Sequence, residues 1–377
     1  MSKSLAFTLV LAFLMASCIS MPLPVKAVFN TITVPDDYST ITAAIANANT
    51  GDVIFIRAGL YEGPINQTIL IDKPLSIVGE NAETTIIELY PAYELTWIIT
   101  QPFYSYTNAI TIETNDVKLS NLTIIIAPGG NIWANGDRIQ ITGNNITTGS
   151  TQTGLLINGS QCNITDNISR FGFINLQGSS NSLVQNYVYK VILEFADWNK
   201  ICLNQITHLQ FNSSNYNTVY GNNVDIKEAT YNSIGVYNSA HNIFQSNQIK
   251  SGLFGVNLRL ESGAKNNTFY HNAFVGEGYH VIIDEASNSN FWDDSNEGNF
   301  WENYNGTDSN GDGIGDTPYV INGANVDNYP LMEPYNVEND AVVLPPPEPF
   351  PTVLAAAALV AAAVGVCLIV YFKKRKH

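Results

Sequence analysis

An asparagine-centred phrase recurs along the middle of the chain and restricts the folds that the chain can adopt. Residues 199–206 read NKICLNQI and residues 217–224 read NTVYGNNV, which share the order Asn, any residue, aliphatic, two residues, Asn, any residue, aliphatic. Short segments of this kind cannot bury an apolar face alone, whereas stacked copies form one continuous core. The second Asn of the phrase recurs every 18 to 25 residues, at Asn121, Asn144, Asn167, Asn186, Asn204, Asn222, Asn247 and Asn272.

The segments around these asparagines alternate with a period of two residues and are rich in Ile, Val, Thr and Tyr. This composition favours strands over helical repeats, which are also longer, and the Leu ladder of a leucine-rich repeat is absent. The sequence therefore predicts an all-β fold, a parallel β-solenoid with coils about 4.8 Å apart. Asparagines at one corner of successive coils can pass side-chain hydrogen bonds along the stack, so the phrase predicts scaffold and names no ligand.

The start of the repeat region predicts a short capping helix over residues 39–48. Ser39 is the expected N-cap, and Ile41, Ala44, Ile45 and Ala48 follow at helical spacing. Such a helix would cover the open end of the solenoid core.

Two cysteines lie outside the apolar ends of the chain. Cys162 precedes Asn167 and Cys202 precedes Asn204, with the coil of Asn186 between them. Two coils span about 10 Å, which is more than a disulfide allows. We expect both thiols to be reduced and buried.

Both ends of the chain carry membrane signals. Residues 1–27 are typical of a secretory signal peptide, and residues 353–372 form an apolar run long enough to span a bilayer before the basic tail 373–377. We predict an extracellular ectodomain over 28–335, a Pro-rich linker over 336–352, and a single pass through the cell membrane with a cytoplasmic C-terminus. Glycosylation sequons, expected in an exported glycoprotein, occur at Asn66, Asn121, Asn145, Asn158, Asn163, Asn167, Asn212, Asn266 and Asn305.

The formal net charge of −16 argues against nucleic acid as a partner, because phosphates require clustered Lys and Arg. Only 13% of residues are charged, and Asn, Thr, Ser, Gly and Tyr are abundant. A hydrogen-bonding surface of this kind suits glycans.

Three stretches carry a family resemblance: VPDDYSTITAAIANANTGDVIFIRAGLYEG followed by IDKPLSIVGE near the start, the Asn repeats, and NFWENYNGTDSNGDGIGDTPYVI near the end. Together, from Thr31 to Met332, they resemble NosD-like and pectin-lyase-like proteins, including secreted, surface-anchored archaeal ones. The resemblance implies a right-handed single-stranded parallel β-helix. It also implies one of three roles: carbohydrate binding, sugar cleavage, or a copper-associated accessory of an ABC transporter.

The side chains provide little support for copper. The repeats contain no Met, since Met332 follows them, and the histidines at 208, 241, 271 and 280 take different offsets from the repeated Asn. Copper sites require clustered Met, Cys or His ligands. Copper, like the transporter partner, is therefore implied only by the resemblance.

An acid/base site is conceivable where GVNLRLES (255–262) aligns with HVIIDEAS (280–287). This alignment stacks Arg259 on Asp284, with Glu261 and Glu285 nearby. Such a column could bind a uronic acid or abstract a proton in a polysaccharide lyase or hydrolase, or it could be a surface ion pair. Whether the protein is an enzyme stays open.

Residues 90–106 form an aromatic segment, YPAYELTWIITQPFYSY, for which we expect a loop laid over the β-helix. Its rings could stack on sugars or pack against the flank of the solenoid. They are Tyr90, Tyr93, Trp97, Phe103, Tyr104 and Tyr106.

Residues 308–316, DSNGDGIGD, resemble the calcium loops of dockerins and thrombospondin repeats. The expected ligands are Asp308, Asn310, Asp312, the carbonyl of Ile314 and Asp316. Tyr319 replaces the bidentate Glu of a complete loop, so affinity should be modest unless Asp327 completes the shell. We expect bound Ca²⁺ to stabilise the C-terminal end.

Overall fold

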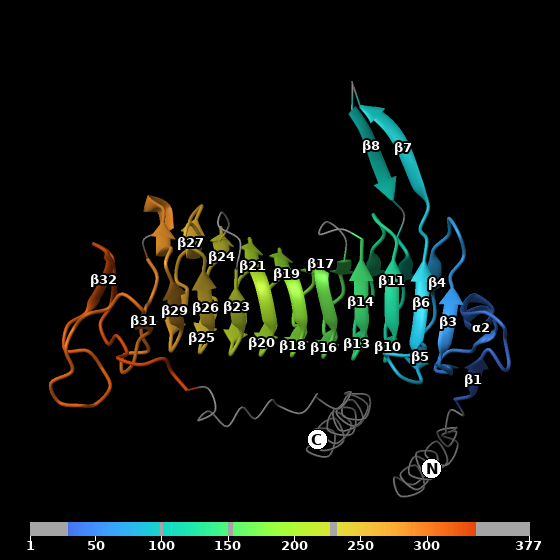
Figure 1. Ribbon diagram of the computed structural model, residues 1–377, viewed down its shortest axis with the longest axis horizontal. Helices are drawn as coiled ribbons and strands as arrows, with labels where there is room; N and C mark the ends of the chain where they lie inside the picture. Colours follow the sequence, from blue (N-terminus) through green and yellow to red (C-terminus); the bar gives the residue numbers. More distant parts are fainter. Residues whose placement is uncertain are drawn as a thin grey trace, which may run out of the picture. The chain divides into compact units, whose positions relative to one another are not determined.

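The computed structural model describes residues 29–98, 101–106, 108–149, 154–226, 232–287 and 289–336. Successive coils of these residues stack into a parallel β-solenoid (Figure 1), which confirms the predicted all-β fold. The predicted signal peptide, most of the linker, the membrane span and the basic tail lie outside this part of the chain. Within it, no helix is long and apolar enough to cross a membrane.

One parallel sheet receives a short strand from each coil. In spatial order its strands are β1 (Thr31–Val34), β2 (Val53–Ile56), β5 (Ser76–Gly79), β10 (Lys118–Ser120), β13 (Gln140–Thr142), β16 (Asn163–Thr165), β18 (Ser182–Val184), β20 (Lys200–Cys202), β22 (Thr218–Tyr220), β25 (Ile243–Gln245) and β28 (Thr268–Tyr270). We call it the first sheet.

The second sheet contains two rows of parallel strands that merge where β17 (Ile168–Leu176), β19 (Tyr187–Glu194) and β21 (Gln205–Asn212) run through both. The near row adds β3 (Gly59–Glu62), β6 (Thr85–Leu89), β11 (Thr123–Ile126), β14 (Asn145–Thr148), β23 (Asn223–Asp225), β26 (Gln248–Ser251), β29 (Ala273–Gly276) and β31 (Phe300–Trp301). The far row adds β4 (Ile69–Ile71), β9 (Ile110–Ile112), β12 (Ile132–Ala134), β15 (Gly154–Ile157), β24 (Asn232–Tyr237), β27 (Val256–Glu261) and β30 (Tyr279–Ile283).

Two antiparallel hairpins and two short helices complete the part of the chain that the structure describes. The hairpins are β7 (Tyr93–Ile98) with β8 (Gln101–Tyr106) and β32 (Tyr319–Asn322) with β33 (Asn325–Asp327), and the helices are α2 (Ile41–Asn47) and the 3₁₀ turn η1 (Glu285–Ser287). Helix α2 packs against β1, β2 and β4, as expected for a cap. Its N-cap is Thr40, whose Oγ1 accepts the N–H of Ala43 at 3.2 Å, and not the predicted Ser39.

The predicted asparagine ladder is present. In each pair the Nδ2 of one Asn donates to the Oδ1 of the next, at 2.9–3.1 Å, and all of these side chains are buried. The first ladder comprises Asn144, Asn167, Asn186, Asn204, Asn222, Asn247, Asn272 and Asn299. Asn167 is among them, so a glycan on this sequon would be incompatible with the fold.

Asn121 was wrongly assigned to this ladder. It is exposed and adopts a φ of 57°, while the next residue, Leu122, donates its N–H to Oδ1 of Asn144 at 3.1 Å. Leu122 is buried and thus occupies the ladder position in this coil. Asn121 instead makes the turn, because Asn tolerates the left-handed conformation.

A second asparagine ladder runs along another corner, immediately before the strands of the first sheet. Its side chains also donate Nδ2 to Oδ1 between coils, at 3.0–3.1 Å. The members are Asn199, Asn217, Asn242, Asn267 and Asn290. The first Asn of the repeated phrase therefore builds one ladder and the second Asn builds the other.

The two cysteines are free and buried, as predicted. Burial raises the pKa of both thiols, Cys162 and Cys202, to about 11. Because the thiolate is the reactive species, we expect neither to react with iodoacetamide at neutral pH until the protein unfolds. Peptide mapping by mass spectrometry with and without denaturant checks this, and labelling of either peptide in the folded protein would contradict it.

Candidate functional site

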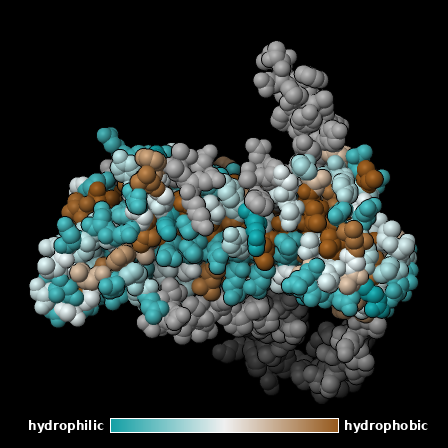
Figure 2. Space-filling view, in the orientation of Figure 1, coloured by the Kyte–Doolittle hydropathy of each residue, from teal (hydrophilic) through white to brown (hydrophobic). Residues whose placement is uncertain are grey.

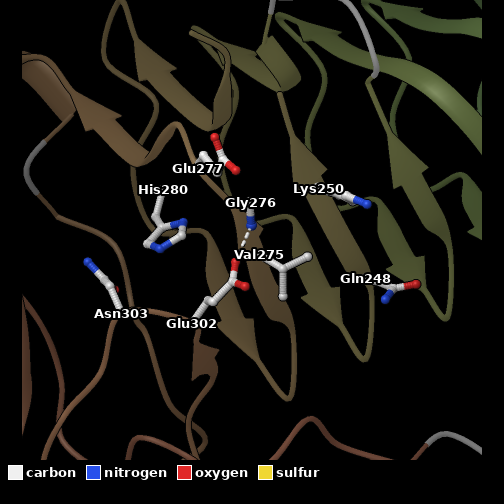
Figure 3. Close-up of a pocket in the computed structure, with 8 residues that line it drawn as sticks. All are labelled: Gln248, Lys250, Val275, Gly276, Glu277, His280, Glu302 and Asn303. Atoms are coloured by element: carbon white, nitrogen blue, oxygen red, sulfur yellow. Dashed lines mark hydrogen bonds between the residues drawn. The ribbon is translucent and has the colours of Figure 1, made fainter. Parts of the chain in front are cut away.

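A pocket of about 440 Å³ opens on the outer face of the second sheet, close to the C-terminal end of the solenoid (Figure 3). The side chains of Gln248 and Lys250 face outward on β26, because Ile249 between them points into the core. In Figure 3 they lie on one side of Val275, and His280 and Asn303 lie on the other. The lining residues are Gln248, Lys250, Val275, Gly276, Glu277, His280, Glu302 and Asn303.

His280 is the most deeply placed titratable group of the pocket. Burial lowers the pKa of its imidazole, and the charge of Glu302 opposes the shift only in part. Its Nδ1 is buried without a hydrogen-bond partner anywhere in the described chain. Glu302 accepts the backbone N–H of Gly276. The pocket thus offers a neutral imidazole near pH 7, with one unused ring nitrogen, beside a fixed carboxylate.

Exposed apolar side chains occur in the same coils as the pocket lining. Tyr279 precedes His280 and is 70% exposed, and Phe254 is 71% exposed. The N–H of Tyr279 donates to the carbonyl of Gly255 at 3.0 Å, which brings the two aromatic positions to adjacent coils. We call Leu253, Phe254 and Tyr279 the aromatic rim. A polar pocket beside exposed aromatic faces can hydrogen-bond a ligand and stack on it.

The charges of the lining disfavour an acidic ligand. Two carboxylates, Glu277 and Glu302, face one ammonium, Lys250, and His280 is neutral near pH 7. The whole chain has a net charge of −16. The acidic lining and the negative chain both repel polyanions, so the pocket suits a neutral, hydroxyl-rich ligand.

The predicted column of Arg259 and Asp284 does not form. Arg259 pairs in register with Ile282 and bonds Glu261 at 2.6 Å, while Asp284 accepts the N–H of Ser262 at 2.7 Å. The connection from β29 to β30 is two residues shorter than that from β26 to β27, which shifts the register by two. Glu285 begins the turn η1, beside Asp284. Polar groups of the turn, the Ser287 side chain first, lower the pKa of the Asp284 carboxyl, and the carbonyl of Asp284 accepts the N–H of Ser287 at 3.1 Å.

The aromatic segment is not a loop laid over the solenoid. Strands β7 and β8 pair only with each other, from Tyr93 opposite Tyr106 to Ile98 opposite Gln101, in a hairpin that leaves the solenoid between β6 and β9 (Figure 1). Trp97 lies opposite Pro102, Phe103 opposite Thr96 and Tyr104 opposite Leu95. Tyr90 lies outside the hairpin, and its hydroxyl donates to Glu88 at 2.8 Å.

The calcium-like loop folds around Asp308. Its carboxylate accepts the N–H groups of Gly311 at 2.7 Å and Gly313 at 2.9 Å, which is the wrapping expected of such a loop. Asn310 and Asp312 bond each other, Asp312 accepts the N–H of Ile314, and Asp316 is held by Ser309 and Thr307. These hydrogen bonds lower the pKa of Asp316.

Asp327 does not complete this loop. Its carboxylate is buried and accepts Nε1 of Trp301 at 2.8 Å and the N–H of Asn299 at 2.7 Å. Asn299 also donates Nδ2 toward the same oxygen, at 3.4 Å. Asp327 therefore ends the first asparagine ladder.

The residues do not fit a copper site. His208 contacts the carbonyl of Asn232, His241 stacks on Tyr216, His271 pairs with Glu297, and His280 lies in the pocket. No three His, Cys, Asp or Glu side chains of the described ranges converge as metal ligands. The buried thiols, with raised pKa values, are poor ligands as well.

Most of the pocket lining carries no signal in the sequence. Of these residues only His280 is a candidate there, as one of four histidines with different offsets from the repeated Asn. Lys250 and Glu302 occupy equivalent outward positions in their coils, and this could have indicated the pocket. Recognising the equivalence requires the register between coils of different length, which the sequence does not provide.

Several known proteins are similar to parts of this chain. None of the curated proteins matches the chain. Among solved structures, the A-module of a mannuronan C-5 epimerase from Azotobacter vinelandii is similar, with 8% identity, a TM-score of 0.46, and coverage of 71% of this chain and 96% of that one. A pectin methylesterase variant in complex with a hexasaccharide shows 13% identity, a TM-score of 0.37, and coverage of 70% and 93%. The catalytic domain of an α-1,3-glucanase in complex with nigerose shows 13% identity, a TM-score of 0.35, and coverage of 74% and 70%.

The family model described as periplasmic copper-binding protein (NosD) matches residues 96–306. This match spans more than half of the 377 residues and most of the stacked coils. The chain therefore belongs to the NosD family.

Proposed function

We propose that this protein is a membrane-anchored surface β-helix that binds neutral glycans through the pocket and its aromatic rim. The apolar run 353–372 with its basic tail supports the anchor. Figure 2 shows one face of the solenoid, where hydrophilic residues predominate and hydrophobic ones are interspersed. Such a face suits ligands that both hydrogen-bond and stack.

The observation that supports the proposal is that the polar pocket and the exposed aromatic rim belong to the same coils. Gln248 and Asn303 supply amides, and Lys250 and Glu302 supply charged donors and acceptors for hydroxyl groups. Tyr279, adjacent to His280, offers a ring face. Glycan sites combine these groups, whereas a purely structural solenoid has no need for an exposed aromatic beside a polar pocket.

We expect Tyr279→Ala to weaken binding of a neutral oligosaccharide about tenfold, the value of one good stacking contact. Isothermal titration calorimetry with the best ligand from a glycan array measures this. Tyr187→Ala is the matched control, because Tyr187 is an exposed tyrosine on the same sheet in an earlier coil. Equal affinities of the Tyr279 variant and wild type would refute the role of the rim.

A glycan-cleaving enzyme is the second candidate. It is favoured by the neutral imidazole of His280 beside two carboxylates, since these groups can accept and donate protons. Incubation of each bound polysaccharide with the protein, followed by chromatography of released products, separates the two functions. Turnover abolished by His280→Ala would establish the enzyme, and binding without release would leave the binding protein.

We also propose that residues 308–316 bind Ca²⁺, which would draw together Asp308, Asp312 and Asp316, separate in this structure, and stabilise the C-terminal end of the solenoid. At about 10 mM calcium we expect a gain of about 1–3 kcal/mol in the free energy of unfolding, given the millimolar to submillimolar affinities of extracellular loops. Asp308→Asn should abolish the gain, and Asp72→Asn, at an exposed position on another coil, should leave it intact. Equal calcium responses of wild type and Asp308→Asn would contradict the site.

A further inference from the structure

One corner of the solenoid carries a continuous row of side chains on left-handed residues, which we call the corner ridge. Each ridge residue lies two positions before a strand of the first sheet, and in all of them except His241 the N–H donates to a carbonyl of the next coil. Since φ lies between 56° and 62° throughout, a residue without strain there would be Gly or Asn. The ridge comprises Asp116, Arg138, Gln161, Ser180, Trp198, Tyr216, His241 and Asn266.

Three successive ridge residues are aromatic and stacked. The ring centroids of Trp198 and Tyr216 are 4.5 Å apart at an angle of 6°, and those of Tyr216 and His241 are 4.9 Å apart at 4°. Trp198 is 60% exposed. The turn itself disfavours bulky side chains, so the backbone geometry does not explain these residues. The presence of aromatic side chains at these positions points to a use of the exposed rings.

The stack is open at its Trp198 end. The preceding ridge residue is Ser180, a small exposed side chain with a hydroxyl group, followed by the exposed amide of Gln161. The outer face of the Trp198 indole therefore has no ring stacked on it. Successive coils lie about 4.8 Å apart, which is close to the distance between stacked rings. A flat apolar face placed there would continue the column by one ring.

We call the open indole face of Trp198, together with Ser180 and Gln161, the shelf. We propose that the shelf is a second glycan subsite, where the C–H face of a neutral sugar stacks on Trp198 and its hydroxyls contact Ser180 and Gln161. Neutral sugars combine an apolar face with a hydroxylated edge, which matches an indole beside a hydroxyl and an amide. A second copy of this chain would instead require a broader apolar surface than this polar ridge provides. The inference rests on the proposed glycan-binding function but uses a different part of the molecule from the pocket.

The test is ¹⁹F NMR of the full-length protein in detergent, labelled with 5-fluorotryptophan and titrated with hexasaccharides of glucose, mannose and N-acetylglucosamine. Trp198→Asn assigns the resonance and keeps the fold, because Asn tolerates the left-handed conformation. We expect a saturable shift of the Trp198 resonance, while those of the buried Trp292 and Trp301 stay fixed. Retention on the same glycan as an immobilised polymer should fall about fivefold to tenfold in Trp198→Asn.

Phe195→Asn is the matched control, since Phe195 lies on the same coil, is 77% exposed and also has a positive φ. It should bind like wild type. No shift of Trp198 with a hexasaccharide that binds the protein would overturn the shelf. A Trp198 shift that depends on protein concentration without sugar would also overturn it, in favour of self-association.

The pocket and the shelf are separable in this experiment. A Trp198 shift that persists in Tyr279→Ala supports the shelf whatever the pocket does. If Tyr279→Ala loses all binding and Trp198 never shifts, the shelf is wrong and the pocket stands. If none of the hexasaccharides binds at all, both proposals fall.

Discussion

Replacement of Asn222 by Ala is expected to lower the free energy of unfolding by about 4 kcal/mol. Asn222 accepts the N–H of Asn204 at 2.9 Å and its Nδ2 at 3.0 Å. It donates Nδ2 to Asn247 at 2.9 Å and to the carbonyl of Ile201 at 2.7 Å. All four hydrogen bonds are buried, and each buried bond lost without replacement costs about 1 kcal/mol or more.

The neighbouring Asn223 provides the control, because it is exposed and faces outward on β23. Asn223→Ala should change the free energy of unfolding by less than about 0.5 kcal/mol. Chemical denaturation followed by circular dichroism compares the two variants. Similar losses of unfolding free energy in both variants would mean that the hydrogen bonds of the ladder do not stabilise the protein as expected.

Asp327 is expected to make the protein less stable as pH rises from about 4 to above 6. Burial raises the pKa of its carboxyl to about 6, although hydrogen bonds from Trp301 and Asn299 oppose the shift. The folded state therefore holds the proton more tightly than the unfolded chain. Stability from this group is complete below the ordinary value of 3.8 and is lost as pH passes through about 6. The two values differ by about 2 units, which corresponds to about 3 kcal/mol.

Asp327→Asn isolates this effect. The amide oxygen of the new Asn can still accept hydrogen bonds from Asn299 and Trp301. The bond from the N–H of Tyr329 is lost, because an amide nitrogen cannot accept it, which costs about one hydrogen bond. Denaturation curves between pH 4 and pH 8 should show a decline in wild type that is absent in the variant. Parallel pH profiles of the two proteins would show that Asp327 does not titrate in this range.

The repeated phrase contains most of the information about the scaffold. Period-two alternation and a constant corner residue specify a parallel stack, and the helix at residues 41–47 follows from apolar spacing. The first Asn of the phrase, which forms the second ladder, is as regular in the sequence as the second Asn. Asn121 was misassigned because Asn favours both the ladder, where it hydrogen-bonds, and the turn before it, where it tolerates positive φ.

Registers between coils of different length could not be predicted. A shift of two residues keeps every side chain on the same face, so alternation cannot distinguish Asp284 from Ile282 as the neighbour of Arg259. The pocket depends on the same registers, since Lys250, Glu302 and His280 come from three coils joined by connections of unequal length. The hairpin of β7 and β8 was missed because prolines and aromatics suggested a loop, although YELTWI alternates as a strand does.

Location of a bound glycan is the most direct test of the proposed function. Crystals of the protein soaked with the neutral oligosaccharide that binds best would show where the sugar lies. We expect electron density in the pocket between Gln248 and Asn303, with one sugar ring against Tyr279. Binding confined to other surfaces, with the pocket and rim empty, would contradict it.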